Sequence, residues 1–424
     1  MPRIFTPLES LPNTYRAFFS GFASLTTAQK QLIQPILDGR DVVLQAGTGS
    51  GKTEAVLAPA TEKLMTHKAP FTIVYIVPTR ALSLDMTRRM KPIYKKLGLK
   101  LGMRTGDGKH LRDAKPDLLI MTPESLDVLL GSQNQDNKYF LKRVGMMIID
   151  EVHVFLGDNR GRQLSYLHHR LAMQAEARLQ TVALSATIDN AEDIMRFFNL
   201  REPPFFYKQS VARKLQPCWV HIEDEEQELT LFFDDLYHRS GCKKLLVFAN
   251  SRKKCEQLVD MLSQESVFSQ HVFLHYSNLS TQERKCIEAS FREGKVGICI
   301  ATSTLELGID IGDIDGIVLM GPPPSTMAFL QRIGRGNRRS QHINFWGICY
   351  GQDAERQLIR FLAFFELAKE HQLEKFCYTE NDSVLFQQIL SCLYAKKVVS
   401  IDSLHLLFKK KSEDLSRIFH HMGR

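Results

Sequence analysis

The chain has 424 residues, which at about 150 residues per domain predicts three domains, or two domains with a tail. Hydrophobic residues make up 44% and charged residues 24%, an ordinary globular composition that excludes a mostly disordered chain, a collagen-like chain and a coiled-coil rod. Lys and Arg together number 55 against 47 Asp and Glu, and the resulting net charge of +8 fits either a nucleic-acid partner or a slightly basic soluble protein.

Signals for targeting, membrane insertion and disulfide formation are missing from the sequence. No run approaches the ~18 uninterrupted apolar residues of a membrane span, and the N-terminal segment has no basic start leading into an apolar core. None of the eight cysteines forms a C-x-x-C pair, which argues against a zinc ribbon or a redox dithiol. We therefore expect a cytoplasmic protein with no membrane partner and with mostly buried, reduced cysteines.

In chain order, short apolar runs alternate with longer amphipathic segments. A first series of runs predicts buried strands: DVVLQA, TIVYIVPT, LLIMTP, MMIID and TVALSAT. A second series predicts another sheet: KLLVFAN, HVFLHY, VGICIATS and GIVLMG. Strands that are apolar on both faces and are separated by helices are typical of parallel α/β sheets.

Domain boundaries follow from changes in this pattern. The segment between the two series holds Pro203, Pro204 and Pro217 and then an acidic run, which indicates a boundary near 205–213. After about residue 352 the pattern is continuously helical. The predicted fold class is α/β, with parallel-sheet domains at 1–208 and 209–365 and a helical tail at 366–424.

A glycine-rich loop follows the first predicted strand and opens a helix. It reads Ala46-Gly47-Thr48-Gly49-Ser50-Gly51-Lys52-Thr53. Glycines let backbone N–H groups converge on phosphate oxygens, and the helix start adds partial positive charge. Lys52 is expected to reach the β- and γ-phosphates of ATP, and the Thr53 hydroxyl to ligate Mg²⁺. Ala46 stands where the strict pattern has Gly, but the flanking strand and helix favour a phosphate loop over a chance glycine turn.

An acidic pair ends the predicted strand MMIID. Asp150 and Glu151 lie at its carboxyl end, where α/β folds bind ligands, and His153 follows. Asp150 is expected to hold Mg²⁺ through water, and Glu151 to accept the proton of the attacking water. Alone, this pattern could be a surface-facing acidic turn. Together with the glycine-rich loop it predicts a site that hydrolyses ATP.

The loop and the acidic pair, followed by Ser185-Ala186-Thr187, resemble motifs I, II and III of the superfamily 2 helicases. Further along, ATSTLELGIDIG (301–312) resembles motif V and QRIGRGNRR (331–339) resembles motif VI. Within the superfamily, the DEVH form, Asn159-Arg160-Gly161 and HYSNLSTQER resemble the Lhr-type (large helicase-related) group. The resemblance covers about residues 20–400, and the tail resembles the start of a winged helix.

The resemblance implies two tandem RecA-like domains that face each other across an ATP cleft. It assigns catalysis to Lys52, Glu151, Arg335 and Arg338, with the two arginines acting as fingers on the γ-phosphate. It assigns ATP binding to Gln29, Gly47, Thr48, Gly49, Ser50, Gly51, Lys52, Thr53, Asp150, Glu151 and Asp310. Gln29 would read adenine and Asp310 would sense the nucleotide through the ribose. The metal ligands would be Thr53 and Asp150.

The resemblance also implies nucleic-acid contacts and residues that couple them to the ATP site. The contacts fall on Arg80, Thr122, Ser125, Asn250, Ser251, Thr302 and Ser303, and coupling falls on Ser185, Thr187 and His153. Contacts of hydroxyl groups and arginine with phosphate and sugar read no base sequence. Binding is therefore predicted to be sequence-independent and salt-sensitive.

The sequence as a whole predicts an ATP-dependent helicase or translocase with ATP and Mg²⁺ as cofactors. Its partner would be single-stranded or partly duplex nucleic acid, and the Lhr-type resemblance favours DNA over RNA and 3′–5′ movement. DNA repair is one expected role, with defence and RNA processing as alternatives. An RNA helicase, and a nucleic-acid-stimulated ATPase module of a larger repair or defence complex, stay open as alternatives. The presence of every residue required for hydrolysis argues against an inactive nucleotide-binding scaffold.

Overall fold

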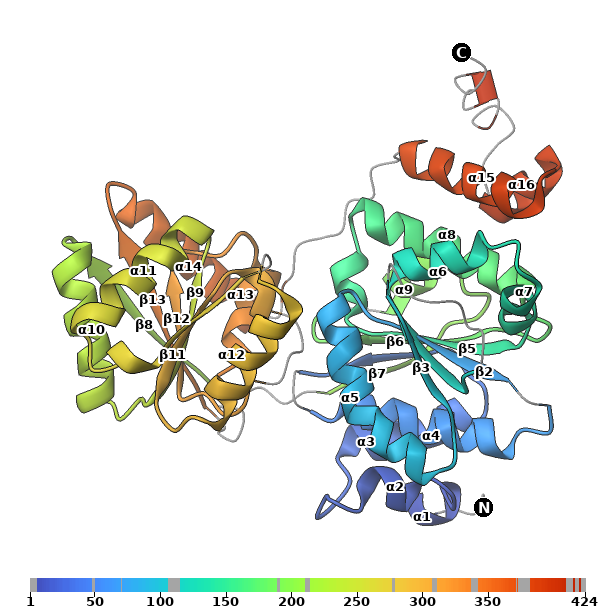
Figure 1. Ribbon diagram of the computed structural model, residues 1–424, viewed down its shortest axis with the longest axis horizontal. Coiled ribbons are helices and arrows are strands. Elements are labelled where there is room, and N and C mark those ends of the chain that lie inside the picture. The colour runs from blue at the N-terminus through green and yellow to red at the C-terminus, as the bar shows by residue number, and fades with distance from the viewer. Residues whose placement is uncertain are drawn as a thin grey trace. The chain divides into compact units, whose positions relative to one another are not determined.

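The computed structural model contains two compact units, which are described separately (Figure 1). The first unit comprises Met1–Gln209 and Phe376–Arg424, and the second comprises Ser210–Lys375. The structure describes residues 6–47, 50–69, 71–105, 115–188, 191–209, 214–276, 279–306, 311–336, 342–370, 372, 382–408, 415, 419 and 420. Both units are built around parallel sheets, which confirms the predicted fold class.

The first unit contains a seven-stranded parallel sheet with the order β3-β4-β2-β5-β6-β1-β7. The strands are β1 (Val42–Gln45), β2 (Thr72–Ile76), β3 (Leu101–Arg104), β4 (Leu118–Met121), β5 (Val144–Ile149), β6 (Gln180–Ser185) and β7 (Phe205–Lys208). Because the strands are parallel, all their carboxyl ends meet at one edge of the sheet. The register pairs Gln45 with Ser185 and Ile76 with Ile149, so the segments that follow these strands begin side by side.

Helices cover both faces of this sheet. Short helices α1 (Pro7–Ser10) and α2 (Tyr15–Phe19) precede α3 (Thr27–Leu37), α4 (Lys52–Thr66) and α5 (Arg80–Lys96), which cover one face. The other face carries α6 (Pro123–Leu130), α7 (Gln135–Lys142), η1 (Val152–Phe155), α8 (Asn159–Gln174) and α9 (Ala191–Phe198). Their apolar side chains form one buried core with the sheet, in which Val74, Leu126, Phe140, Leu167 and Phe198 are at most 3% exposed.

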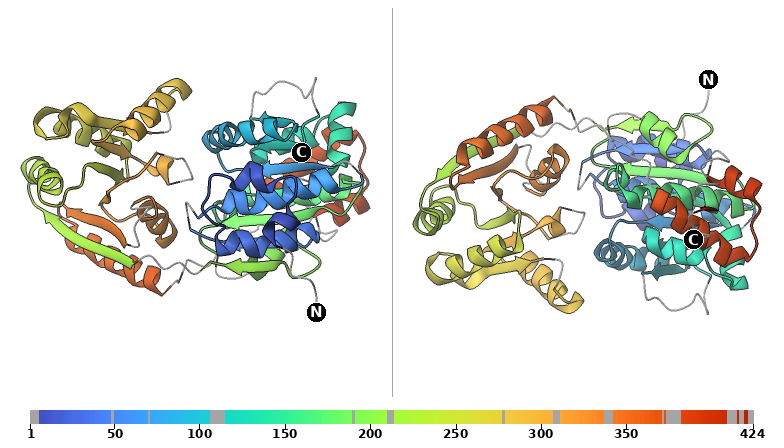
Figure 2. Two further views of the ribbon diagram at one scale, coloured as in Figure 1. Left: turned by 90° about the horizontal axis from the view of Figure 1, so that it is seen from below. Right: turned by 90° about the horizontal axis from the view of Figure 1, so that it is seen from above.

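Two C-terminal helices belong to the first unit. α15 (Asp382–Lys396) and α16 (Ile401–Phe408) lie on α6 and α8, as Figures 1 and 2 show. They bury their own apolar cluster, in which Phe408 meets the ring of Tyr166 edge-on at 5.1 Å. The helices of the described tail therefore extend the first unit.

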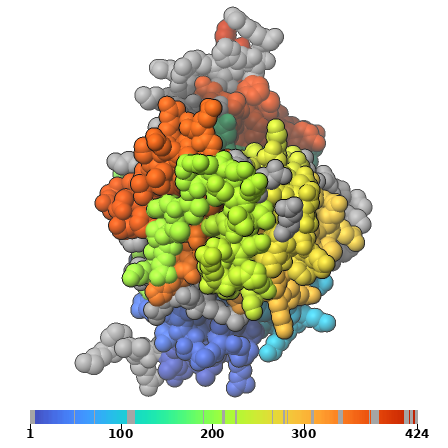
Figure 3. Space-filling model, turned by 90° about the vertical axis from the view of Figure 1, so that its left-hand side faces the viewer, coloured from blue at the N-terminus to red at the C-terminus, as the bar shows by residue number. Residues whose placement is uncertain are grey.

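The second unit contains a six-stranded parallel sheet with the order β10-β11-β9-β12-β13-β8. The strands are β8 (Lys214–Ile222), β9 (Lys244–Ala249), β10 (Val272–His275), β11 (Gly297–Ala301), β12 (Gly316–Met320) and β13 (His342–Tyr350). The helical segments are α10 (Glu225–His238), α11 (Arg252–Glu265), η2 (Ser269–His271), α12 (Thr281–Glu293), η3 (Ser303–Leu305), α13 (Thr326–Ile333) and α14 (Ala354–Lys369). Figure 3 shows the side of this unit on which α10, α11 and α14 lie at the surface.

The structure also bears on the expectations about membranes and cysteines. Among the described residues, no helix combines the length and the apolarity that crossing a membrane requires. The seven cysteines described are all free thiols, and five of them are buried.

Candidate functional site

The glycine-rich loop connects β1 to α4 at the carboxyl edge of the first sheet. Gly51 caps α4 in the left-handed conformation, with φ 79°, which glycine adopts without the strain that a side chain would cause. Lys52 is the first residue of the helix and is 8% exposed, while Thr53 behind it is half-buried. The Ser50 hydroxyl donates to the Gly47 carbonyl at 2.7 Å and closes the loop. Thr48 and Gly49 lie outside the described residues.

Gln29 is held against this loop. Its side-chain carbonyl accepts a 2.8 Å hydrogen bond from the Thr26 N–H, and the Gln29 N–H donates to Thr26 Oγ1 at 3.2 Å, which together form a capping box at the start of α3. A Cβ on Gly51 would lie 2.7 Å from Gln29 Nε2. Gln29 is 1% exposed, so its amide is fixed beside the phosphate loop. Adenine recognition by Gln29 stays a prediction.

The acidic pair lies beside Lys52. Lys52 Nζ is 3.4 Å from Glu151 Oε1, and both side chains are at least nine-tenths buried. Asp150 accepts hydrogen bonds from the Tyr75 hydroxyl at 3.0 Å and from the Glu151 N–H at 2.9 Å. Burial, and then the charge of Glu151, raise the pKa of Asp150 to about 6, against the opposing effect of Lys52. Sequence reasoning missed Tyr75, which its place in an apolar strand gave no reason to single out.

These side chains suit a magnesium ion that is shared with a nucleotide. The Asp150 carboxylate and the Thr53 hydroxyl are hard oxygen donors of the kind Mg²⁺ prefers. No group of three or more His, Cys, Asp or Glu in the described part of the chain could hold a metal ion alone. Mg²⁺ is commonly bound by one or two protein ligands together with substrate phosphates, and this donor set fits that arrangement.

Glu151 has a left-handed backbone, with φ 47° and ψ 46°, which is uncommon for a residue with a side chain. The turn aims the chain into η1, where His153 is 1% exposed. His153 Nδ1 lies 2.8 Å from Ser185 Oγ, which also accepts a 2.9 Å hydrogen bond from the Thr187 N–H. The three predicted coupling residues thus form one chain of contacts next to the acidic pair. Burial lowers the pKa of His153 to about 4, so its ring is neutral at pH 7.

The predicted nucleic-acid residues of the first unit follow strands β2 and β4 at the same sheet edge. Arg80 is exposed at the start of α5. Thr122 caps α6, and its hydroxyl lies 3.3 Å from that of Ser125, which is 1% exposed. Arg160 connects the two segments, donating to the Pro78 carbonyl at 2.9 Å and to Glu124 Oε1 at 2.7 Å. Sequence reasoning used Arg160 only as part of a family resemblance and missed this bracing contact.

The predicted nucleic-acid residues of the second unit follow its central strands β9 and β11. Ser251 is exposed and caps α11, accepting a hydrogen bond from the Lys254 N–H at 3.2 Å. Thr302 and Ser303 lie at the start of η3, directly after β11. Asn250 Nδ2 donates to the Pro322 carbonyl at 2.9 Å, so its amide also ties two loops of the unit together.

Arg335 is fully enclosed in the second unit. It is 1% exposed, and its Nη2 donates to the Glu306 carbonyl at 2.6 Å. The Glu306 carboxylate accepts from Arg332 Nε at 2.7 Å, and Arg332 Nη1 donates to Asn250 Oδ1 at 2.8 Å. This network joins Asn250 to Glu306 of motif V and to Arg332 and Arg335 of motif VI, and the sequence did not predict it. Asp310 and Arg338 lie outside the described residues.

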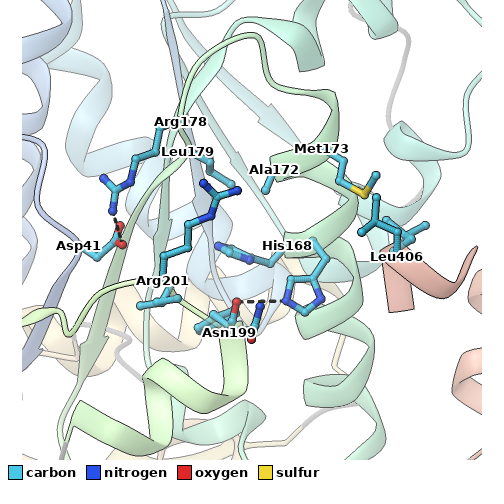
Figure 4. Close-up of a pocket in the computed structure, with 13 residues that line it drawn as sticks. Asp41, His168, Ala172, Met173, Arg178, Leu179, Asn199, Arg201 and Leu406 are labelled. Atoms are coloured by element: carbon cyan, nitrogen blue, oxygen red, sulfur yellow. Dashed lines mark hydrogen bonds and ion pairs between the residues drawn. The ribbon is translucent and has the colours of Figure 1, made fainter. Parts of the chain in front are cut away.

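A cavity of about 450 Å³ opens elsewhere on the first unit (Figure 4). Its lining includes Asp41, His168, Arg178, Arg201 and Leu407. Asp41 precedes β1 and Arg201 precedes β7, so the cavity lies at the amino ends of these strands. It contains none of the predicted site residues, and it lies at the opposite edge of the sheet from the glycine-rich loop.

Comparison with known proteins agrees with this arrangement. The family model for the DEAD/DEAH box helicases matches residues 26–194, and the model for the helicase conserved C-terminal domain matches residues 228–340. The ATP-dependent helicase Lhr-Core of Methanocaldococcus jannaschii is 30% identical over 93% of this chain and 50% of its own length. The chain thus spans about half the length of this relative.

Two further matches broaden the comparison. The structure of Mycobacterium smegmatis helicase Lhr bound to ssDNA and AMP-PNP superimposes with a TM-score of 0.80 at 25% identity, over 96% of this chain and 56% of that one. The ATP-dependent RNA helicase eIF4A of Saccharomyces cerevisiae is 26% identical over 90% of this chain and 92% of its own length. The proteins that this chain resembles therefore include a helicase solved with ssDNA and a helicase named for RNA.

Proposed function

We propose that this chain, which belongs to the superfamily 2 helicases of the Lhr type, hydrolyses ATP. It uses the energy of hydrolysis to move 3′–5′ along single-stranded DNA. One observation carries the proposal: Lys52, Asp150 and Glu151 converge at the carboxyl edge of the first sheet. This combination of a phosphate-binding cation, a metal-binding carboxylate and a base is what phosphoryl transfer to water requires.

In this proposal each side chain has one task. The loop N–H groups and Lys52 bind the β- and γ-phosphates, and Gln29 orients the adenine beside Gly51. Glu151 orients the attacking water and accepts its proton. Bound Mg²⁺, held by Thr53 and Asp150, would neutralise charge on the phosphates.

The second unit would complete the reaction. Arg335 and Arg338 would neutralise charge that develops on the γ-phosphate, and Asp310 would sense the ribose. Because base and arginine fingers belong to different units, hydrolysis would require closure of the two units. Arg335 would first have to leave its contact with the Glu306 carbonyl.

Movement would result from coupling this closure to two nucleic-acid grips. Arg80, Thr122 and Ser125 would form one grip, and Asn250, Ser251, Thr302 and Ser303 the other. The contacts from His153 through Ser185 to Thr187 would transmit the state of the ATP site to the first grip. DNA is favoured because the solved Lhr structure at 25% identity holds ssDNA.

A second candidate is an ATP-dependent RNA helicase. The observation in its favour is the match to eIF4A, which covers 92% of that relative. A third is a nucleic-acid-stimulated ATPase module of a larger repair or defence complex, which would hydrolyse ATP but separate strands poorly.

Steady-state ATP hydrolysis tests the proposal. The rate is measured without nucleic acid, with single-stranded DNA and with RNA, for the wild type and Glu151→Gln. We expect strong stimulation by DNA that is lost in Glu151→Gln and kept in Glu355→Gln, a matched change at an exposed position on α14. Preferential stimulation by RNA would replace the DNA proposal with the RNA helicase. Hydrolysis that neither polymer affects would refute translocation. Unwinding of a partly duplex DNA is measured beside the ATPase rate, and stimulated hydrolysis without unwinding would favour the ATPase module.

A further inference from the structure

Asp127 in the middle of α6 lies at the centre of a buried polar cluster. Its Oδ1 accepts from Arg170 Nη1 at 3.1 Å and from Ser391 Oγ at 2.9 Å. Its Oδ2 accepts from three side-chain amides, those of Gln163 at 2.9 Å, Gln387 at 2.7 Å and Gln388 at 2.8 Å. The exposed fractions of Asp127, Arg170 and Gln388 are 8%, 3% and 0%. The charge of Asp127 is thus paired with Arg170, and four neutral donors fix its orientation.

The donors come from two helices far apart in the sequence. Gln163 and Arg170 belong to α8, and the other three belong to α15. Arg170 Nη1 also donates to Gln388 Oε1 at 2.7 Å and to Ser391 Oγ at 3.0 Å, so α8 and α15 hold each other as well as Asp127. Buried charge-assisted hydrogen bonds are strong and geometrically specific. The cluster therefore fixes the position of α6 against both helices.

The amino end of α6 carries the predicted nucleic-acid contacts of the first unit. Thr122 caps α6, and Ser125 is two residues before Asp127. α15 also holds the carboxyl end of α6, because Gln133 Nε2 donates to the Tyr394 carbonyl at 2.7 Å and a Cβ on Gly131 would lie 3.3 Å from Ser391 Oγ. A short, rigid helix transmits a displacement at one end to the other.

We propose that α15 is a positioning element for the nucleic-acid grip of the first unit, and that it acts through Asp127. It holds in place the amino-terminal turn of α6, which carries Thr122 and Ser125, and thereby sets the affinity for nucleic acid without touching nucleotide or strand. This inference rests on the proposed function, since it requires a grip at the start of α6.

The test measures the concentration of single-stranded DNA that gives half-maximal stimulation of ATP hydrolysis. Ser391→Ala removes a hydroxyl donor to Asp127 and the longer, 3.0 Å contact of Arg170 with α15. Gln388→Leu removes an amide donor to Asp127 and the shorter, 2.7 Å contact of Arg170, at a side chain that is 0% exposed. We expect this concentration to rise about threefold and about tenfold respectively, the size typical of coupling through packed elements. The maximal rate and the KM for ATP should stay within about twofold of the wild type.

Phe408→Leu is the matched control. It weakens packing of the C-terminal helices on Tyr166 but leaves the contacts of α15 with Asp127 in place. It should lower the melting temperature and leave the half-maximal DNA concentration unchanged. All assays are run at a temperature where every variant is folded.

Two results would overturn the inference. One is an unchanged half-maximal DNA concentration in Ser391→Ala and Gln388→Leu, which would make the cluster a structural contact only. The other is an equal rise in Phe408→Leu, which would indicate general loosening. If the wild type itself shows no stimulation by nucleic acid, the proposed function fails and this inference fails with it. If DNA stimulates the wild type and the half-maximal DNA concentration of the two variants is unchanged, this inference fails and the proposed function stands.

Discussion

The Tyr75 hydroxyl donates a 3.0 Å hydrogen bond to Oδ2 of Asp150. Tyr75 lies on β2, whose register pairs it with Ile148 of β5, so its side chain reaches the carboxylate that follows that strand. The Glu151 N–H binds the other oxygen at 2.9 Å. Both oxygens of Asp150 are therefore oriented by the protein, and groups that orient a metal ligand contribute to metal affinity.

Tyr75→Phe should weaken the use of Mg²⁺ without changing the shape of the core. The substitution removes one buried donor to Asp150, and loss of such a partner typically lowers metal affinity about tenfold or more. We expect the Mg²⁺ concentration for half-maximal ATP hydrolysis to rise about tenfold. The free energy of unfolding should fall by about 1–3 kcal/mol.

Tyr94→Phe is the control for this prediction. Tyr94 is equally buried, and its hydroxyl shares a 2.8 Å hydrogen bond with Thr61, away from the acidic pair. It should lower stability by a similar amount and leave the Mg²⁺ dependence as in the wild type. An unshifted Mg²⁺ dependence in Tyr75→Phe would show that the hydrogen bond only supports packing.

His168 should make the first unit less stable in acid. Burial lowers the pKa of this ring to about 3, while in the unfolded chain the pKa is about 6.5. As the pH falls, the unfolded state takes up the proton first, so stability present above pH ~6.5 is lost on acidification. Between pH 7 and pH 5 this loss should amount to about 2 kcal/mol.

Urea unfolding at pH 7 and pH 5 measures this loss. His168→Gln keeps a polar group near Thr181, whose hydroxyl lies 2.8 Å from His168 Nε2, but cannot titrate. It should therefore show a smaller loss between the two pH values. His67→Gln, at an exposed histidine of the same unit, should behave like the wild type. Equal losses in all three proteins would contradict the prediction.

In the first unit, the strands that could be predicted are those buried on both faces. β1, β2, β4, β5 and β6 correspond to the five apolar runs of the first series, and they are the five inner strands of the sheet. β7 and β8 lie in the segment between the two series, where the sequence indicates a domain boundary and predicts no strand. Each is an edge strand of its sheet and is only partly buried, so its sequence is not continuously apolar. Pro217 is accommodated in β8 because an edge strand has a side without ladder hydrogen bonds.

The sequence also indicated that the glycine-rich loop and the acidic pair would meet, because both follow central parallel strands. It gave no indication of the cluster around Asp127. Gln388 is 261 residues from Asp127, and a polar residue on an amphipathic helix is read as solvent-facing unless its partners are known. Long-range polar pairing depends on tertiary packing, which periodicity does not encode.

Gly161 should tolerate no side chain. A Cβ there would overlap the Phe155 carbonyl oxygen, and backbone cannot move aside as a side chain can. Gly161→Ala should therefore destabilise the first unit by more than about 3 kcal/mol. Gly21→Ala is the control, since nothing lies within 4 Å of its added Cβ. Comparable melting temperatures for the two variants would contradict this prediction.

Glu306→Gln should destabilise the second unit selectively. The substitution removes the charge partner of Arg332, which is 3% exposed, and breaking a buried ion pair typically costs about 3–5 kcal/mol. Asp235→Asn breaks the exposed pair of Asp235 with Arg239, so it should cost less than about 0.5 kcal/mol. Urea unfolding measures both changes, and binding of a fluorescent ATP analogue to the first unit should be unaffected in either variant. Equal stability of the two variants would contradict this prediction. The Arg332–Glu306 contact would then contribute no more to the free energy of unfolding than a surface pair, and other hydrogen bonds would have to stabilise the network that holds Arg335.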